Sequence, residues 1–250
     1  VLIFKLVGSP PRYEAIRVKP TPRGPYQGGI PVTTEQQIDR ALAFFTDEEH
    51  LSSYELLEGS GSVLISAPHA MLQTRNGSIK CAERFTGMLC RMMHERIGCP
   101  VIYKTRHLRD DANHDPVSDY RDALCRYVKQ HDIHLVVDLH QMKPERKTDV
   151  CVGTGHGRNL MGHPELAALF VDGFRECGIQ KITIDDPFDA SGPNTVSATV
   201  AARCRVPAVQ LELNTRLLMS GYEDYRFLPV LATLCDLTER LNHRPVEIAL

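Results

Sequence analysis

Three stretches of the chain are mostly apolar over the length of a single strand. They are rich in Val, Ile and Leu and are bounded by polar or turn-forming residues, which is typical of strands buried on both faces. The stretches are residues 63–68, 133–137 and 207–211. The pattern therefore predicts three buried strands of an α/β sheet.

Polar side chains that can carry chemistry come at or just after the end of each stretch. The residues are His69 for the first, Asp138 and His140 for the second, and Glu212 and Asn214 for the third. Residues two apart on a strand point to the same face, so Asp138 shares a face with His140. Open α/β sheets bind ligands beyond the carboxyl ends of their strands, and we therefore expect these groups to lie in one site. The alternative for any single histidine is a hydrogen-bonded residue of the core.

Strand-like and helix-like segments alternate along the rest of the chain. Further strands are predicted at 101–103, 149–152 and 181–184, and helices at 33–45, 80–97, 120–128, 163–177, 195–204 and 223–241. This order predicts an α/β fold of three layers, a mostly parallel central sheet with helices on both faces. Residues 8–31 are punctuated by Pro and Gly and are expected to be irregular. We expect residues 1–60 to be an N-terminal extension that packs on a single domain of residues 61–250.

Composition and charge narrow the class of protein. The chain has 250 residues, 42% hydrophobic and 24% charged, which suffices for one globular domain with a sizeable core. Its net charge of −2 gives no electrostatic footprint for nucleic acid or for an anionic membrane. The eight cysteines include no C-x-x-C pair, so we expect free thiols in a reducing cytoplasm, without a disulfide framework or a zinc site made of cysteine. The sequence leaves the oligomeric state open.

The residues at the strand ends suit a metal ion. Two imidazoles and a carboxylate form a ligand set for Zn²⁺, whose catalytic sites leave one position for water. A further glutamate that does not bind the metal would serve as general base for that water. Glu83, in the first turn of the helix predicted at 80–97, could complement the helix dipole or bind a metal held by His69. The residue chemistry alone leaves both interpretations open.

Short motifs spread over residues 63–219 resemble a known family. They are Pro68-His69, Glu83 to Gly87, Thr105-Arg106, Asp111 to Asn113, Asp138 to His140, Val152 to Thr154, Asp186 to Phe188 and Gln210 to Asn214. In this order they resemble the N-formylglutamate amidohydrolases, zinc hydrolases with a phosphorylase/hydrolase-like α/β fold akin to that of the zinc carboxypeptidases. The resemblance implies His69, Glu83 and His140 as zinc ligands. It implies Glu212 as the general base, and Asp138 is expected to support His140.

The chain departs from the family pattern at two places. The family usually has a Gly soon after the first histidine, where this chain has Ala70-Met71-Leu72, and it often has an Arg at the position of His114. That Arg would be expected to bind a substrate carboxylate or to polarise the carbonyl, and Arg106, Arg121 or Arg216 could substitute for it. The residues expected to bind substrate are Arg106, Asn113, Arg121, Asn214 and Arg216.

These observations predict a zinc-dependent amidohydrolase that cleaves the amide bond of a small N-acyl, formyl-like amino acid. Its substrate would be a small molecule or a short peptide, and neither nucleic acid nor a membrane would be a partner. One alternative is a metallocarboxypeptidase-like enzyme that acts on peptides or cell-wall fragments. Another is a binding protein that keeps the fold without the metal. A serine hydrolase is the weakest alternative because the chain contains no G-x-S-x-G motif.

Overall fold

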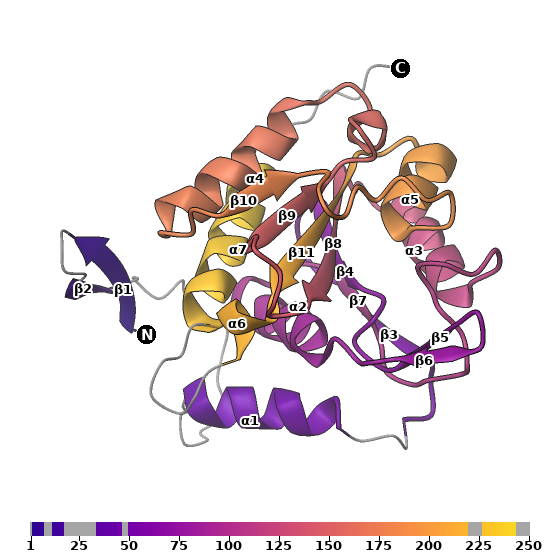
Figure 1. Ribbon diagram of the computed structural model, residues 1–250, viewed down its shortest axis with the longest axis horizontal. Coiled ribbons are helices and arrows are strands. Elements are labelled where there is room, and N and C mark those ends of the chain that lie inside the picture. The colour runs from indigo at the N-terminus through magenta and orange to yellow at the C-terminus, as the bar shows by residue number, and fades with distance from the viewer. Residues whose placement is uncertain (1, 8–11, 18–33, 47–49, 220–226, 244–250) are drawn as a thin grey trace.

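The computed structural model describes residues 2–7, 12–17, 34–46, 50–219 and 227–243 (Figure 1). Its centre is a seven-stranded sheet in the order β10-β9-β11-β8-β4-β7-β3. The strands are β3 (Tyr54–Leu57), β4 (Val63–Ala67), β7 (Val101–Lys104), β8 (Leu135–Met142), β9 (Val150–Gly153), β10 (Ile182–Ile184) and β11 (Ala208–Asn214). Neighbours pair in parallel except for β9 with β11 and β3 with β7. The predicted mostly parallel sheet is therefore confirmed.

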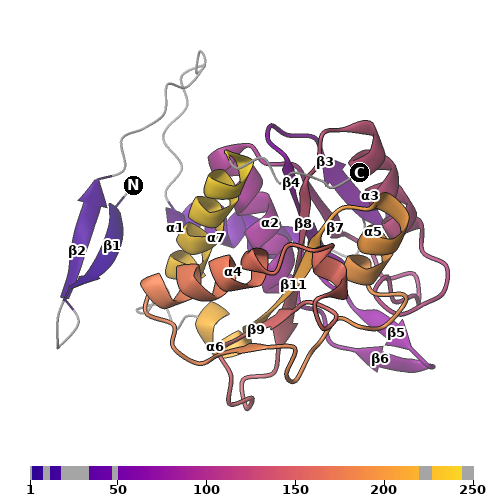
Figure 2. The same cartoon turned by 90° about the horizontal axis from the view of Figure 1, so that it is seen from above.

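Helices cover both faces of the sheet, which confirms the predicted three layers. The helices are α1 (Thr34–Phe44), α2 (Arg84–Ile97), α3 (Asp119–Gln130), α4 (Glu165–Glu176), α5 (Val196–Cys204), α6 (Thr215–Leu218) and α7 (Phe227–Asn242), with a 3₁₀ turn at Arg158–Leu160. Seen from above, α3 and α5 lie on one side of the sheet and α2, α4 and α7 on the other (Figure 2). Within the described residues, each helix is too short or too polar to cross a membrane.

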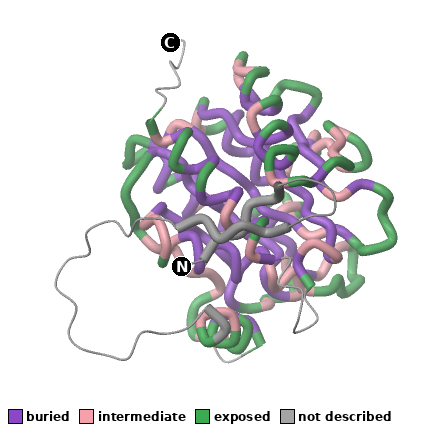
Figure 3. Tube along the Cα trace, turned by 90° about the vertical axis from the view of Figure 1, so that its left-hand side faces the viewer, coloured by how far each residue is buried: buried purple, intermediate pink, exposed green. Residues whose placement is uncertain are grey.

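Alternation along β8 decides which face carries the site. Val137 and Leu139 pack into the larger core, on the side of α2 and α7, whereas Val136 packs into the smaller core, on the side of α3 and α5. Strand residues two apart share a face, so Asp138 and His140 project to the side of Val136. Figure 3 shows how the buried chain runs through the middle of the body. The polar residues of β8 therefore lie on the α3 side, towards the carboxyl end of the strand.

Several boundaries differ from those expected, and two of them affect the site. β8 continues to Met142, so Asp138 and His140 lie within the strand and not beyond it. α2 begins at Arg84 and not at residue 80, so Glu83 occupies the N-cap position. The start expected for the last helix, residue 223, lies outside the described residues, and α7 is described from Phe227.

Two short hairpins were not predicted. β1 (Leu2–Val7) pairs antiparallel with β2 (Arg12–Arg17), which lies in the segment expected to be irregular. β5 (Gln73–Arg75) pairs antiparallel with β6 (Ser78–Lys80), between His69 and Glu83. β2, β5 and β6 escape prediction because they are short and lack an apolar run, whereas β1 is apolar but only six residues long.

Part of the first 60 residues belongs to the body of the fold. Tyr54–Leu57 forms the edge strand β3. Phe45, just after α1, is fully buried, and an added Cβ at Gly87 of α2 would lie 2.4 Å from its ring. The glycine thus permits the close approach of the two segments. The domain boundary at residue 60 stays a prediction.

Candidate metal centre

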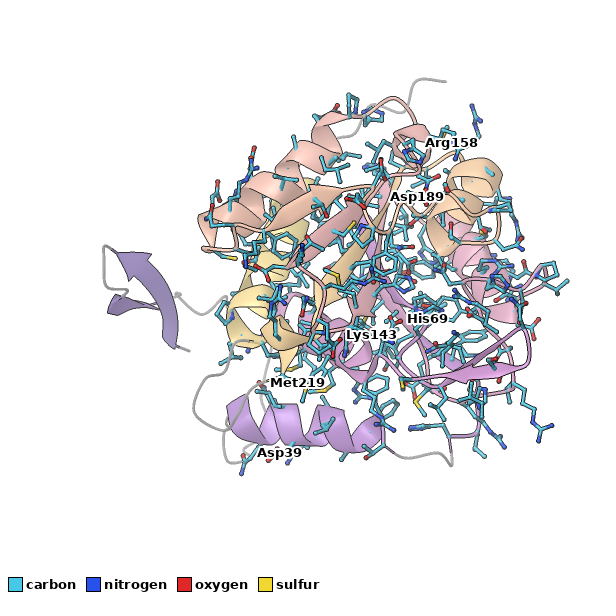
Figure 4. All side chains as sticks on the ribbon, in the orientation of Figure 1. Asp39, His69, Lys143, Arg158, Asp189 and Met219 are labelled. Carbon is cyan, nitrogen blue, oxygen red and sulfur yellow. The ribbon has the colours of Figure 1, made fainter. Side chains whose placement is uncertain are left out.

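Three side chains from separate elements meet at the carboxyl ends of the central strands. His69 follows β4, Glu83 is the N-cap residue of α2, and His140 lies on β8. Each offers one ligand atom, and these atoms lie within 4.8 Å of one another. The two imidazole rings are nearly perpendicular, at 81°, with centroids 4.7 Å apart. Figure 4 labels His69 within the body of the molecule.

The Glu83 carboxylate bridges the two histidines. Its Oε1 lies 3.1 Å from Nδ1 of His69, and its Oε2 lies 3.3 Å from Nδ1 of His140. Oε2 also accepts a hydrogen bond of 2.9 Å from the backbone N–H of Gln141. Burial raises the pKa of Glu83, but the charges of His69 and His140 outweigh it and lower the pKa to about 2. The side chain makes no capping hydrogen bond to α2, so its hydrogen bonds go to the cluster and not to the helix N-terminus.

The second nitrogen of His69 contacts a different carboxylate. Nε2 lies 2.9 Å from Oδ1 of Asp111, a fully buried residue. Arg75 donates a hydrogen bond of 2.8 Å from its Nε to Oδ2 of the same carboxylate. Burial raises the pKa of Asp111, but its hydrogen bonds with His69 and Arg75 lower it well below its usual range. The pKa of His69 is raised because Glu83 and Asp111 outweigh the opposing effect of burial.

His140 is held in a similar way by a buried network. Its Nε2 lies 3.0 Å from Oδ2 of Asp138, and Oδ1 of Asp138 accepts a 2.7 Å hydrogen bond from the Ser66 hydroxyl. The Ser66 hydroxyl lies 2.9 Å from the Tyr120 hydroxyl. Burial lowers the pKa of His140, but Asp138 and Glu83 raise it well above its usual value. These contacts are compatible with the expected role of Asp138 in supporting His140.

The donor set fits a divalent cation. Both histidines direct Nδ1 towards the shared carboxylate of Glu83 and Nε2 towards a separate carboxylate. When a histidine carries its proton on Nε2, that N–H donates a hydrogen bond to Asp111 or Asp138. The lone pair of Nδ1 is then free to bind a metal. Two imidazole nitrogens and one carboxylate oxygen match a catalytic zinc site, which keeps one position open.

Glu212 lies beside the ligand cluster without belonging to it. Its strand β11 pairs in parallel with β8, and the register places Glu212 opposite His140. The side chain is buried and accepts a 3.1 Å hydrogen bond from Nε2 of Gln210. It also lines a cleft that opens over the ligand cluster. Burial raises the pKa of Glu212 to about 7, against the lowering effect of the charge on His140. A carboxylate with this pKa can take up and release a proton near neutral pH.

A cleft of ≈ 1120 Å³ opens over these residues. Its walls come from the β5–β6 hairpin, the loop after β8, the loop after β10, and Thr215 at the start of α6. The cationic side chains that line it are Arg75, Lys80, Lys143 and Arg146. The Arg146 guanidinium lies 5.2 Å from the centre of the Phe188 ring. A smaller depression of ≈ 610 Å³ between α4 and α7 contains none of the three cluster residues.

The residues expected to bind substrate have different surroundings. Asn113 lines the cleft, with its Nδ2 3.3 Å from Nε2 of His140, and its Oδ1 accepts a 2.6 Å hydrogen bond from the N–H of Val196 at the start of α5. The other four residues, Arg106, Arg121, Asn214 and Arg216, do not line the cleft. Asn113 is thus the one member of the expected set that the structure brings to the candidate centre.

Three of those four residues hold loops by hydrogen bonds, and the fourth is exposed. Arg121 is buried and donates to the carbonyls of Ala112 and Asp115, each at 2.5 Å. Arg216 donates to Oδ1 of Asp149 and to the backbone carbonyls of residues 144, 146, 147 and 148. The side-chain amide of Asn214 donates to the carbonyls of residues 146 and 148. Arg106 lies on the surface. Their substrate-binding roles remain predictions.

Several cleft residues were missed by sequence reasoning. Arg75 and Lys80 lie in the segment between His69 and Glu83, where the sequence suggests only a polar loop, and Arg146 lies in the charged loop after His140. The one signal that could have found them is their nearness in sequence to the ends of strands that carry candidate ligands.

Comparison with solved structures finds proteins whose fold is similar to that of this chain. The chain is similar to a gene product from Agrobacterium tumefaciens, with a TM-score of 0.53 and 13% identity over 76% of this chain and 94% of that one. It is similar to a bacteriophage poly-γ-glutamate hydrolase, with a TM-score of 0.51 and 15% identity over 78% of this chain and 92% of that one. For N-formylglutamate amidohydrolase from Ralstonia eutropha, the TM-score is 0.51 and the identity is 16%, over 77% of this chain and 98% of that one.

At these identities the similarity concerns the fold. The fold implied by the resemblance to the N-formylglutamate amidohydrolases is therefore confirmed. No protein-family model matches the chain, and no curated protein matches it.

Proposed function

We propose that the protein is a zinc-dependent amide hydrolase. The observation that carries the proposal is the arrangement of His69, Glu83 and His140, in which both Nδ1 atoms face one carboxylate and both Nε2 atoms face other carboxylates. Such pairing with a carboxylate fixes the tautomer of a metal-binding histidine. The fold similarity to an N-formylglutamate amidohydrolase and to a poly-γ-glutamate hydrolase, both named for cleaving amide bonds, adds support.

The proposed roles divide between the metal and one glutamate. When bound by His69, Glu83 and His140, zinc would polarise the substrate carbonyl and lower the pKa of a water molecule. Glu212 would remove the proton from the attacking water and later deliver it to the leaving amine. Burial raises its pKa to about 7 and a bound cation would lower it again, so the carboxylate could accept the proton of the water near neutral pH.

The substrate proposed is a small N-acyl amino acid with a formyl-like acyl group. Its carboxylate would be bound by a cationic side chain of the cleft, and Arg75, Lys143 and Arg146 are available for this. Asn113 remains a candidate for a polar contact to the acyl amide, since it lines the cleft beside His140.

All eight cysteines are free, which supports the cytoplasmic location proposed from the sequence.

A second candidate substrate is a peptide, as in the metallocarboxypeptidase-like alternative. The observation that favours it is the size of the cleft, ≈ 1120 Å³, which lies above the roughly 300–1,000 Å³ typical of sites for small ligands. Such a volume holds more than one residue of a chain.

The test combines metal analysis with a substrate panel. Purified protein is analysed for zinc, and release of formate, acetate or free amino acid is measured from N-acyl amino acids and from short acidic peptides. Stoichiometric zinc together with cleavage of N-acyl amino acids supports the main proposal. Stoichiometric zinc with cleavage of peptides alone supports the metallocarboxypeptidase-like alternative. Protein without stoichiometric zinc, inactive on both groups after zinc is added, would favour a binding protein that keeps the fold.

A further inference from the structure

Hydrogen bonds of Gln73 and Thr74 connect the start of the β5–β6 hairpin to segments that carry residues of the candidate metal centre. The Gln73 amide donates to the carbonyl of His69 at 3.1 Å, to that of Met71 at 2.6 Å and to that of Cys81 at 3.3 Å. The backbone N–H of Thr74 donates to the carbonyl of Asp110 at 3.0 Å. These bonds join the start of the hairpin to the segment after His69 and to the residue before Asp111. The position of the hairpin is therefore tied to both partners of the His69–Asp111 contact.

Arg75 extends this connection through its side chain. Its Nε donates to Oδ2 of Asp111 at 2.8 Å, and Oδ1 of Asp111 lies 2.9 Å from Nε2 of His69. The backbone N–H of Asn113 donates to the same Oδ1 at 3.0 Å. Asp111 is fully buried, whereas the Arg75 side chain is 37% exposed and lines the cleft. A buried carboxylate needs a charged or hydrogen-bonding partner on each oxygen, and Arg75 supplies the partner of Oδ2.

The carboxylates that contact the two Nε2 atoms, Asp138 and Asp111, are held by different kinds of partner. Behind His140, Asp138 is held by the Ser66 hydroxyl, which contacts the Tyr120 hydroxyl, and these residues are buried. Behind His69, Asp111 is held by a cation that reaches in from the wall of the cleft. The carboxylate behind His140 is thus held within the core, whereas the carboxylate behind His69 is held by a backbone N–H and by one side chain of a surface hairpin.

We propose that Arg75 is a positioning residue of the metal centre. It fixes the carboxylate of Asp111, which in turn fixes the ring of His69 with its Nδ1 towards Glu83. Without Arg75, Oδ2 of Asp111 loses its partner and the carboxylate is held only at Oδ1, by the N–H of Asn113, so the ring of His69 is held less firmly. This inference rests on the proposed function, because it takes His69 to be a zinc ligand.

Zinc affinity measured on the metal-free protein tests the inference without any assay of activity. Zn²⁺ is titrated against a chromophoric chelator that competes for it. Arg75→Gln should bind zinc about 10-fold more weakly, the lower end of the effect seen for residues that orient metal ligands. The matched control is Lys80→Gln, which removes the same charge from the same hairpin and the same cleft; its zinc affinity should equal that of the unaltered protein.

A double variant separates action through Asp111 from an independent effect of charge. Asp111→Asn should weaken zinc binding, and adding Arg75→Gln to it should cause no further loss, because the two residues act in one chain of contacts. Arg75→Gln with unaltered affinity would overturn the inference, and so would a fully additive double variant. Thermal unfolding of the metal-free proteins checks the fold. If Arg75→Gln does not fold, Arg75→Met replaces it, because Met keeps much of the side-chain volume without the donor. Arg75→Met must then bind zinc about 10-fold more weakly and add no loss to Asp111→Asn. An unaltered protein that binds no zinc would instead refute the proposed function, so the two failures are distinguishable.

Discussion

Glu212 lies directly opposite His140 in the register of the parallel strands β11 and β8. Adjacent strands run about 4.8 Å apart, and residues in register project to the same face. The arrangement puts a buried carboxylate beside a candidate metal ligand while the ligand set is completed by Glu83 from another element. A base placed in this way can reach a water molecule at the metal without binding the metal itself.

Replacement of Glu212 by glutamine should separate catalysis from metal binding. Glu212→Gln keeps the shape of the side chain and removes its basicity. We expect zinc to stay bound while kcat falls by about 10²- to 10⁴-fold, the usual contribution of general acid–base catalysis. Zinc analysis and steady-state kinetics measure the two quantities, with Glu165→Gln on the exposed start of α4 as a control. Loss of zinc would make Glu212 a ligand, and full activity would move the base elsewhere, first of all to Asp138.

The pH dependence of kcat/KM should carry the signature of the same residue. Burial raises the pKa of Glu212 to about 7. A base acts in its deprotonated form, so kcat/KM should rise with pH while Glu212 loses its proton. A bound divalent cation favours the carboxylate and should shift the midpoint below about 7. The profile is measured across the acidic and neutral range, and an identical acid limb in Glu212→Gln would assign the titration to another group.

Removal of His140 should remove the metal and keep the fold. His140→Ala deletes one of the two imidazoles, whereas β8 continues to pair through its backbone with β4 and β11. We expect most of the zinc to be lost while the circular dichroism of the folded chain persists. His134→Ala is the matched control, because His134 precedes β8 at its opposite end and contacts Asp132. Full zinc occupancy in His140→Ala would contradict the assignment.

The two interpretations of Glu83 give opposite results in one variant. If Glu83 binds zinc, Glu83→Gln should weaken zinc binding, since a neutral amide replaces the carboxylate between the two Nδ1 atoms. If Glu83 serves only the dipole of α2, the change should cost less than about 1 kcal/mol of stability and leave the zinc affinity unaltered. Chelator competition and thermal unfolding measure both effects on the same sample. The contacts of the carboxylate with both histidines lead us to expect the first result.

The sequence predicts the strands and the candidate ligands of the site better than it predicts the residues that line the cleft. β4 and the first residues of β8, Leu135 to Val137, are mostly apolar because both faces of the sheet are covered, and such runs can be recognised locally. The approach of His69 to His140 then follows from the meeting of the carboxyl ends of parallel strands. The N-cap position of Glu83 was missed because residues 80–82 lie outside α2, although the sequence contains no turn-forming residue there that would delay the start of the helix.

The partners of long charged side chains cannot be found in this way. Arg121 donates to two loop carbonyls and Arg216 to an aspartate and several carbonyls, so both serve the loops that surround the cleft. Arg75, in a segment with no periodic pattern, reaches Asp111 across 36 positions of the chain. An Arg side chain is long enough to satisfy its donors in many directions, and the direction taken depends on tertiary contacts that local sequence does not contain.

Asn214 offers a final prediction in which positioning and direct binding differ. From the sequence we expect Asn214 to hold substrate, so that Asn214→Ala weakens kcat/KM without affecting the metal. Its side chain is fully buried and outside the cleft, and it donates to the carbonyls of Arg146 and Thr148. The effect on substrate should therefore pass through the loop that carries Arg146. Asn214→Ala should raise KM, keep the zinc, and cost about 1–3 kcal/mol of stability, because two buried hydrogen bonds are lost although Arg216 still donates to both carbonyls.

Arg146→Gln distinguishes the two routes. It removes one of the cations that line the cleft and leaves Asn214 in place, and it should raise KM by itself. If Asn214 acts by positioning Arg146, the double variant should raise KM no more than Arg146→Gln alone, since residues in one chain of contacts are not additive. Independent, multiplying effects on KM would mean that Asn214 reaches the substrate in another way. A loss of zinc in Asn214→Ala would show instead that the loop after β8 helps to hold the metal centre.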